Sequence, residues 1–145
     1  MKYFVVIALL FFNLGNACSC IGKSKIKPEI KASSLIVSGV IIGSKMMQDH
    51  SNNYTSSFME YSVLVQKVFK GSISNDTIKI YTGVGKGDCG YRFVIGQKYI
   101  IYANIPTEYK YSPLTDTEYF YTDICMRTMS YTVDEEKKIK RYTKT

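Results

Sequence analysis

LIVSGVIIGS, the stretch from Leu35 to Ser44, consists largely of β-branched and apolar residues with a glycine near its middle. Branched side chains favour an extended backbone, because they pack well on the pleated surface of a sheet. Gly39 lies inside the run, and a glycine within a strand is typical of a bulge or a sharp bend. We therefore expect a strand over residues 35–44 that bends near Gly39.

Four further segments have the patterns of strands. The segments from Met59 to Val65 (MEYSVLV) and from Thr77 to Tyr81 (TIKIY) alternate apolar and polar residues, which indicates half-buried strands. The segment from Lys98 to Ala103 (KYIIYA) is a continuous apolar run that suits a buried strand. Glu118 to Thr122 (EYFYT) is the fifth segment. Five short strands with bends marked by glycine predict a mainly β fold, in the form of a small closed barrel.

Two other segments carry the signals of helices. Ser24 to Ser33 (SKIKPEIKAS) predicts a short helix with Pro28 near its start. Thr132 to Arg141 (TVDEEKKIKR) predicts a second helix, because its first residue is a suitable N-cap and Glu135 follows at the spacing of a capping box. Its acidic residues come first and its basic residues last, as the helix dipole favours. The polar segment from Gln48 to Ser57 (QDHSNNYTSS) predicts a loop.

The first residues have the pattern of a secretory signal. A positively charged start precedes an apolar run from Tyr3 to Phe12, and small residues lead to Ala17, immediately before Cys18. We expect cleavage at this point, which divides the chain into a signal peptide over residues 1–17 and one domain over 18–145. The mature protein is expected to be secreted or periplasmic and not transmembrane, because no later segment is long and apolar enough to cross a bilayer.

A lipoprotein signal is the alternative, because Cys18 directly follows the small residues. Lipidation would anchor the protein to a membrane through Cys18, and it would leave an odd number of cysteines for disulfide pairing. Cleavage to a free Cys18 leaves four cysteines in an oxidising compartment, which favours two disulfides. The sequence alone leaves their connectivity open.

The formal net charge of the chain is +7. A basic exported protein is expected to meet acidic surfaces or glycans rather than nucleic acid. We expect a monomer, since a domain of this length can bury a core without a partner.

No arrangement of residues indicates an enzyme. The segment from Gly83 to Gly87 (GVGKG) lacks the spacing of a phosphate-binding loop, and a strained turn that presents Cys89 is the better interpretation. The spacing of Cys18 and Cys20 could hold a soft metal, but the single histidine, His50, lies in a polar loop and offers no further ligand there. A nucleophilic triad lacks its base for the same reason. We therefore expect a protein without catalytic activity and without a cofactor of its own.

The mature start Cys18-Ser19-Cys20 resembles the start of the tissue inhibitors of metalloproteinases and of the wider netrin-like module. Each shared fragment is short, but their order and the cysteine spacing make the set fairly specific. The resemblance covers nearly the whole mature chain, and it corresponds to a single-domain, non-animal version of the inhibitory domain. The similarity continues at Ala32 to Val40, Val68 to Gly71, Asp88 to Tyr91, Gly96 to Tyr102 and Thr122 to Cys125.

This resemblance implies a five-stranded, OB-like closed barrel with one or two short flanking helices. It also implies two disulfides, Cys18–Cys89 and Cys20–Cys125. These bridges would hold an otherwise frayed amino terminus against the barrel.

The function implied by the resemblance is that of a secreted inhibitor of zinc metalloproteases. The α-amino nitrogen and the carbonyl oxygen of Cys18 would bind the zinc ion of the protease and displace its catalytic water. The zinc belongs to the target protease, and Ser19 would enter the specificity pocket beside it. The residues expected to contact the protease are Cys18, Ser19, Cys20, Ile21, Gly87 and Asp88.

A tyrosine-rich segment supports an alternative function. Aromatic rings with a polar tip suit interfaces and sugar stacking, and OB-type barrels bind oligosaccharides through their loops. The alternative is a secreted binding module for glycan or protein ligands, without zinc chemistry. The simpler interpretation of these tyrosines is that they pack in a strand and its loop. The residues concerned are Tyr109, Lys110, Tyr111, Tyr119 and Tyr121.

Overall fold

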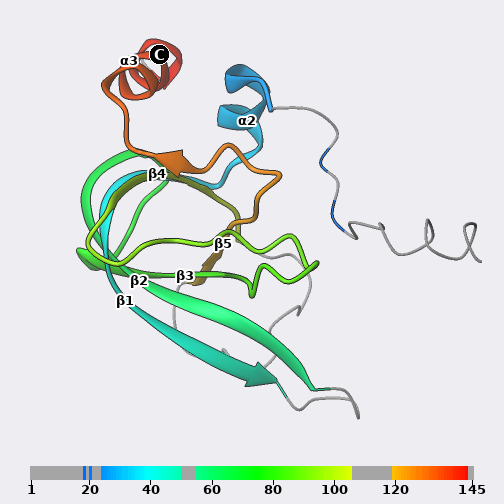
Figure 1. The fold of residues 1–145 in the computed structure, drawn as a ribbon. Helices are drawn as coiled ribbons and strands as arrows, with labels where there is room; N and C mark the ends of the chain where they lie inside the picture. The colour runs from blue at the N-terminus through cyan, green and yellow to red at the C-terminus, as the bar shows by residue number, and fades with distance from the viewer. Residues whose placement is uncertain (1–17, 19, 21–23, 50–54, 106–118, 144–145) are drawn as a thin grey trace, which may run out of the picture.

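The computed structural model describes residues 18, 20, 24–49, 55–105 and 119–143. Within these residues the chain forms two short helices and six strands, and the strands make one sheet in the order β5-β3-β2-β1-β4-β6. Figure 1 shows that the sheet curls round on itself and that both helices lie at one end of it. The fold is therefore mainly β, as the sequence predicts.

A long antiparallel hairpin forms the centre of the sheet. Its strands are β1 (Leu35–Asp49) and β2 (Ser56–Lys70), and their register shifts at three places, one of them between Ser38 and Gly39. A side chain at Gly39 would meet the main-chain oxygen of Leu64 at 2.7 Å, so the two strands can approach this closely only at a glycine. The predicted irregularity at Gly39 is confirmed.

The remaining strands extend the sheet on both sides of this hairpin. β3 (Thr77–Gly83) pairs antiparallel with β2, and β4 (Lys98–Ala103) pairs antiparallel with β1. β5 (Tyr119–Tyr121) runs parallel to β3, and β6 (Met129–Ser130) lies antiparallel to β4. The described residues thus form one strand more than the sequence predicts, because a strand as short as β6 has no visible alternation.

β5 also contacts the chain just beyond β4. Asn104 forms an isolated antiparallel bridge with Tyr121 of β5. The amide of Asn104 donates to the carbonyl of Tyr121 at 2.9 Å, and the amide of Tyr121 donates to the carbonyl of Asn104 at 2.8 Å. The hydroxyl of Thr122 donates to the carbonyl of Tyr102 at 2.8 Å. β5 is therefore bonded to β3 on one side and to the end of β4 on the other, and the sheet has the shape of a curled half-barrel.

The sheet carries an apolar core on each face. Successive side chains of a strand point to opposite faces, so alternate residues of β1 and β4 enter different cores. The larger core, inside the curl, contains Leu35, Val37, Ile41, Tyr61, Val63, Ile78, Ile80, Phe93, Tyr99, Ile101, Ala103 and Phe120. The smaller core, beneath the helices, contains Ile30, Ile36, Ile100, Tyr102 and Ile139.

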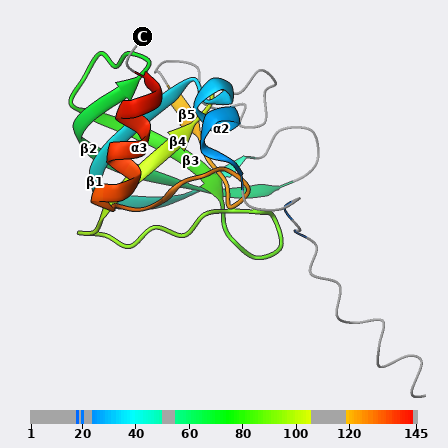
Figure 2. The same ribbon diagram turned by 90° about the horizontal axis from the view of Figure 1, so that it is seen from above.

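The two helices cover the outer face of the sheet, and Figure 2 shows them side by side. α2 (Ile26–Ala32) and α3 (Val133–Thr143) lie close to the predicted ranges, and each contributes one isoleucine to the smaller core, Ile30 and Ile139. Within the described part of the chain, no helix has the length and apolar character needed to cross a membrane.

The predicted loop over residues 48–57 is too long at both ends. β1 continues to Asp49 and β2 already begins at Ser56, with Gln48 paired to Ser57. The side chains of Gln48, Ser56 and Ser57 are exposed, so main-chain pairing alone extends the hairpin here. Polar residues on both faces leave no apolar alternation, which is the pattern that would have indicated a strand here.

Candidate functional site

Two disulfides join the predicted mature terminus to two turns that follow strands of the sheet. Cys18 is bonded to Cys89, with their Cα atoms 5.4 Å apart, and Cys20 is bonded to Cys125, with their Cα atoms 5.1 Å apart. These are the pairs that the resemblance implies. Cys18 and Cys20 are both half-buried, so this short segment lies against the domain.

The two disulfides lie next to each other. The sulfur atoms of Cys18, Cys89 and Cys125 all lie within 4.8 Å of one another. Every cysteine of the chain is paired, so this cluster offers no thiolate to a metal. Its role in the fold is to connect Cys18 and Cys20, the turn after β3 and the turn after β5 at one place.

Asp88 organises the turn that presents Cys89. Its carboxylate accepts hydrogen bonds from the amides of Val84 at 2.6 Å, Gly85 at 2.7 Å and Gly90 at 3.2 Å. Burial alone would raise the pKa of Asp88, but the bonds from these amides outweigh it and hold the pKa below its ordinary value. The charged carboxylate of Asp88 therefore stabilises the main chain of its own turn, although the side chain lies at the surface.

Several glycines are needed for the shape of this turn. Gly85 and Gly87 have φ angles of 74° and 93°, in the left-handed region that glycine enters without strain. A side chain at Gly90 would meet the carbonyl oxygen of Gly83 at 2.1 Å. Cys89 itself has a φ of 59°, which is uncommon for a residue with a side chain. The expectation of a strained turn that presents Cys89 is confirmed.

A second aspartate organises the turn that presents Cys125. Asp123 accepts hydrogen bonds from the amides of Cys125 at 2.8 Å and Met126 at 3.0 Å. Ile124 lies between Asp123 and Cys125 in the sequence. Its amide donates to the carbonyl of Cys89 at 3.0 Å, and this bond connects the two turns. Ile124 is 47% exposed, so an apolar side chain lies at the surface beside the two disulfides.

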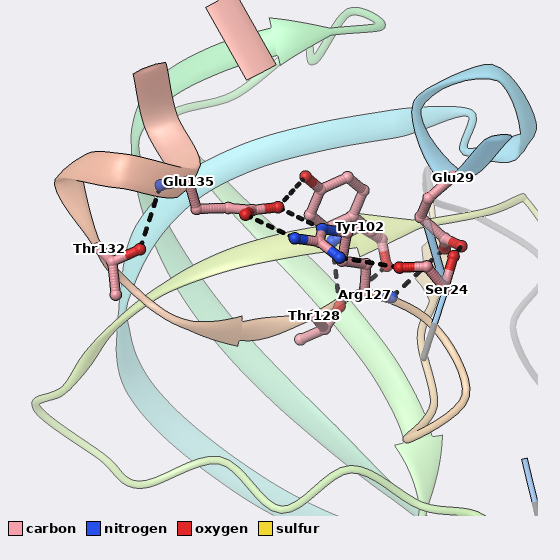
Figure 3. A network of polar contacts seen from close by, with 7 residues as sticks. All are labelled: Ser24, Glu29, Tyr102, Arg127, Thr128, Thr132 and Glu135. Atoms are coloured by element: carbon pink, nitrogen blue, oxygen red, sulfur yellow. Dashed lines mark hydrogen bonds and ion pairs between the residues drawn. The ribbon is translucent and has the colours of Figure 1, made fainter. Parts of the chain in front are cut away.

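An ion pair between the half-buried Arg127 and the buried Glu135 fixes the chain just after the disulfide segment, as Figure 3 shows. Arg127 binds both carboxylate oxygens of Glu135 in α3, and its second amino group donates to the carbonyl of Ser24 at 2.8 Å. Ser24 in turn donates its hydroxyl to Glu29 of α2. The terminal segment is thus held by a disulfide at Cys20 and by a charged hydrogen bond at Ser24.

Glu135 keeps its charge inside the protein because of its partners. The hydroxyl of Tyr102 donates to its carboxylate at 2.8 Å, beside the bonds from Arg127. Burial would raise the pKa of Glu135, but the bonds from Arg127 and Tyr102 outweigh it and hold the pKa below its ordinary value. Burial, together with the Glu135 carboxylate, raises the pKa of Tyr102.

The sequence predicts part of this arrangement. The N-cap at Thr132 is confirmed, because its hydroxyl accepts a hydrogen bond from the amide of Glu135 at 3.2 Å. The side chain of Glu135, however, is bonded to Arg127 and Tyr102 rather than back to the amide of Thr132, so the capping box is only half formed. Arg127 is not among the residues predicted from the sequence to matter. A signal for it was present, since an acidic residue on the inner face of a helix needs a basic partner.

The predicted contact residues fall into three groups. Cys18 and Cys20 lie beside the turn of Gly87 and Asp88, because the bond from Cys18 to Cys89 joins the two segments. Gly87 and Asp88 are both exposed. Two further predicted contact residues, Ser19 and Ile21, lie outside the described residues.

The tyrosine-rich segment of the alternative function is described only in β5. The ring of Tyr119 lies edge-on to Tyr81, with ring centres 6.0 Å apart, and the hydroxyl of Tyr121 donates to Asp123 at 3.0 Å. Both tyrosines thus pack in the strand. The other predicted members of the segment and the loop histidine lie outside the described residues, namely His50, Tyr109, Lys110 and Tyr111.

Comparison of the sequence with known protein families finds no matching family model, and no curated protein is significantly similar to the chain. A functional assignment therefore rests on the geometry of the disulfide-bound terminus and on the resemblance of its motifs.

Proposed function

We propose that the chain is a secreted netrin-like domain that inhibits zinc metalloproteases through the main chain of Cys18, and that it is not an enzyme. In this proposal the signal peptide ends at Ala17, and Cys18 has a free α-amino group. The observation that carries the proposal is the double attachment of the terminus, because Cys18 and Cys20 are bonded to two adjacent turns of the barrel.

We also propose that the sheet is a closed, OB-like barrel. The parallel pairing of β3 with β5 and the bridge between Asn104 and Tyr121 support closure, because they bond β5 to both of its neighbours in such a barrel. On this interpretation β6 is an addition to the edge of the five-stranded barrel.

The chemistry of the proposed inhibition belongs to the amino end of Cys18. A catalytic zinc keeps one coordination position open for water or substrate, and a neutral amine nitrogen is a suitable ligand for it. The α-amino group has a reference pKa of about 7.7–8.0, so it can lose its proton near neutral pH at little cost. The carbonyl oxygen of the same residue would complete the chelate and displace the catalytic water.

The rigid attachment of the terminus supports tight binding. A free chain end would have to be ordered on binding, and this ordering would weaken the affinity. Here the disulfides span 71 and 105 residues, and in the chain-entropy model each contributes about 4–5 kcal/mol to folding. The cost of ordering the terminus is therefore met during folding rather than at the protease.

We assign different roles to the two exposed residues before Cys89. Gly87 has no side chain, so a protease can approach its main chain closely. Asp88 is a positioning residue, because its carboxylate is engaged by three amides of its own turn. On this proposal Ser19, Ile21 and Gly87 flank the zinc-binding end on either side.

The test compares the mature protein, beginning at Cys18, with a variant that carries one additional alanine before Cys18. Cleavage of a fluorogenic peptide by a panel of secreted zinc metalloproteases is the readout. The mature protein should inhibit at least one protease, and the extended variant should not, because its first amine has become an amide. Intact mass under non-reducing conditions verifies the starting residue, the absence of lipid and both disulfides in each sample.

Two results would contradict the proposal. In the first, the extended variant inhibits as well as the mature protein. In the second, the mature protein with a verified free amine inhibits none of the proteases. Equal thermal stability of the two proteins serves as the control, since the added alanine should leave the fold intact.

A further inference from the structure

A second candidate site lies between the two helices and the end of β2, away from the disulfides. It is a cavity of about 500 Å³. Figure 2 shows that α2 and α3 lie side by side. The side chains that line the cavity are Lys27, Ile30, Lys31, Phe69, Lys70 and Tyr142, together with Thr143.

Three of these side chains are lysines, and within the described part of the chain none of them forms an ion pair with an acidic side chain. Among the described residues, the ion pairs involve other basic groups, and none includes Lys27, Lys31 or Lys70. The ammonium group of Lys70 instead donates to the carbonyls of Ile30 at 2.6 Å and Lys31 at 3.0 Å, at the end of α2. The cavity therefore gathers positive charge that no described carboxylate neutralises, which favours an anion.

The floor of the cavity is apolar and partly aromatic. Ile30 is 8% exposed, Phe69 is half-buried, and Tyr142 is 37% exposed. The ammonium group of Lys27 lies 5.0 Å from the centre of the Tyr142 ring. A ligand suited to this site has an anionic group for the lysines and an apolar face for the rings.

We infer that this cavity binds an acidic oligosaccharide, such as a sulfated or uronate-containing sugar. A hexose ring offers an apolar C–H face to the aromatic floor, while its sulfate or carboxylate groups meet Lys27 and Lys31. The volume of the cavity lies within the range of ordinary small-ligand sites.

The surroundings of the cavity favour a polymer over a single small anion. α3 carries further basic side chains, and Lys137, Lys138 and Arg141 are exposed. A chain of acidic sugars bound in the cavity can continue along this helix. The site shares no residue with the disulfide-bound terminus, so the inference stands whether or not Cys18 binds zinc.

The test measures the binding of a heparin-derived tetrasaccharide and of its fully desulfated counterpart by calorimetry. We expect binding of the sulfated sugar that weakens as salt is added, because salt screens exposed charges. The desulfated sugar should bind much more weakly. A Lys27→Gln/Lys31→Gln variant should lose about tenfold in affinity, as expected for two exposed charge contacts. In NMR titrations the shifts should map to α2, α3 and the end of β2.

The matched control is Lys45→Gln, which removes an exposed lysine of β1 that does not line the cavity. This variant should bind as the unchanged protein does. The inference is wrong if the sulfated sugar does not bind at physiological salt, or if the double variant binds no more weakly than the control. Binding to vesicles of anionic phospholipid without binding to the sugar would also overturn it, in favour of a membrane surface.

Discussion

Asp88 is an exposed acidic residue whose charge serves its own main chain. A carboxylate at the surface is usually solvated by water, but three amide groups occupy this one. Hydrogen bonds to a charged group are stronger than those between neutral groups. One side chain thus determines the course of the turn that holds Cys89 beside Cys18.

Replacing Asp88 by alanine should destabilise the protein and weaken the proposed inhibition. The change leaves the three amides without their common acceptor, and we expect a loss of about 1 kcal/mol in the free energy of unfolding. Urea denaturation measures this loss. Asp76→Ala is the matched control, because Asp76 is also exposed and belongs to a turn between strands. Equal losses from the two substitutions would contradict the role assigned to Asp88.

The effect of Asp88 should also depend on pH. Its pKa in the folded protein lies below the ordinary value. The stabilisation is therefore fully present above the unfolded-state pKa of about 3.9 and is lost as the pH falls through the lower folded-state value. The difference in stability between the unchanged protein and Asp88→Ala should be constant near neutral pH and should shrink in acid below about pH 4.

For Glu135, the sequence predicts the position in a helix but not the side chain that it contacts. The sequence places Glu135 correctly in the first turn of a helix, and the structure confirms the N-cap before it. The identity of its side-chain partner could not be inferred, because β6 lies between Arg127 and Glu135 in the sequence and the path of the chain there decides whether the two side chains meet. Local spacing determines a cap, whereas this ion pair depends on how the segment between β5 and α3 folds.

At the scale of elements, the hairpin of β1 and β2 depends on close contact at a glycine. The shift of register near Gly39 changes how the two strands face each other, and it helps the sheet to curl. Gly43 lies in the same strand, near another register shift, but its surroundings are open, since an added side chain would meet only the Cβ atom of Ser62 at 4.0 Å.

The two glycines should therefore respond differently to alanine. Gly39→Ala should lower the free energy of unfolding by about 2 kcal/mol, because the methyl group would displace the main chain of β2. Gly43→Ala should be nearly neutral or slightly stabilising, since alanine restricts the unfolded chain more than glycine does. Thermal denaturation of both variants tests the pair, and a similar loss at Gly43 would count against the close approach as the cause.

The strands were predictable where one face is apolar. The alternation in β2 and β3 and the continuous run of β4 are visible in the sequence because the residues concerned enter a core. The distal part of the hairpin was missed, since its exposed polar side chains carry no such period. β6 was missed because two residues are too few to show one.

At the scale of the whole molecule, the two disulfides attach one short segment to turns that lie far apart in sequence. The bond from Cys20 to Cys125 reaches the turn after β5, and the bond from Cys18 to Cys89 reaches the turn after β3. Spacing alone could not select these pairs. The resemblance implied them, and the curl of the sheet brings the two turns together.

Removing the second bridge should free the segment around Cys20 while the sheet remains folded. A Cys20→Ser/Cys125→Ser variant should lose about 2–5 kcal/mol of stability, as is usual for a native disulfide. Amide hydrogen exchange should increase around Ser24 and at the start of α2, and the proposed inhibition should weaken by a similar factor at every susceptible protease. Intact mass verifies that the bond from Cys18 to Cys89 persists. Unchanged exchange at Ser24 would mean that Arg127 alone holds the segment.

The long sequence separations of these bridges also dictate an order of assembly. As the polypeptide emerges, Cys89 becomes available before Cys125, so the two early cysteines compete for one late partner. A wrong choice at that moment is corrected only by thiol–disulfide exchange. The segment of Cys18 and Cys20, although it is made early, is consequently among the last to reach its final place, because the bond from Cys20 requires Cys125.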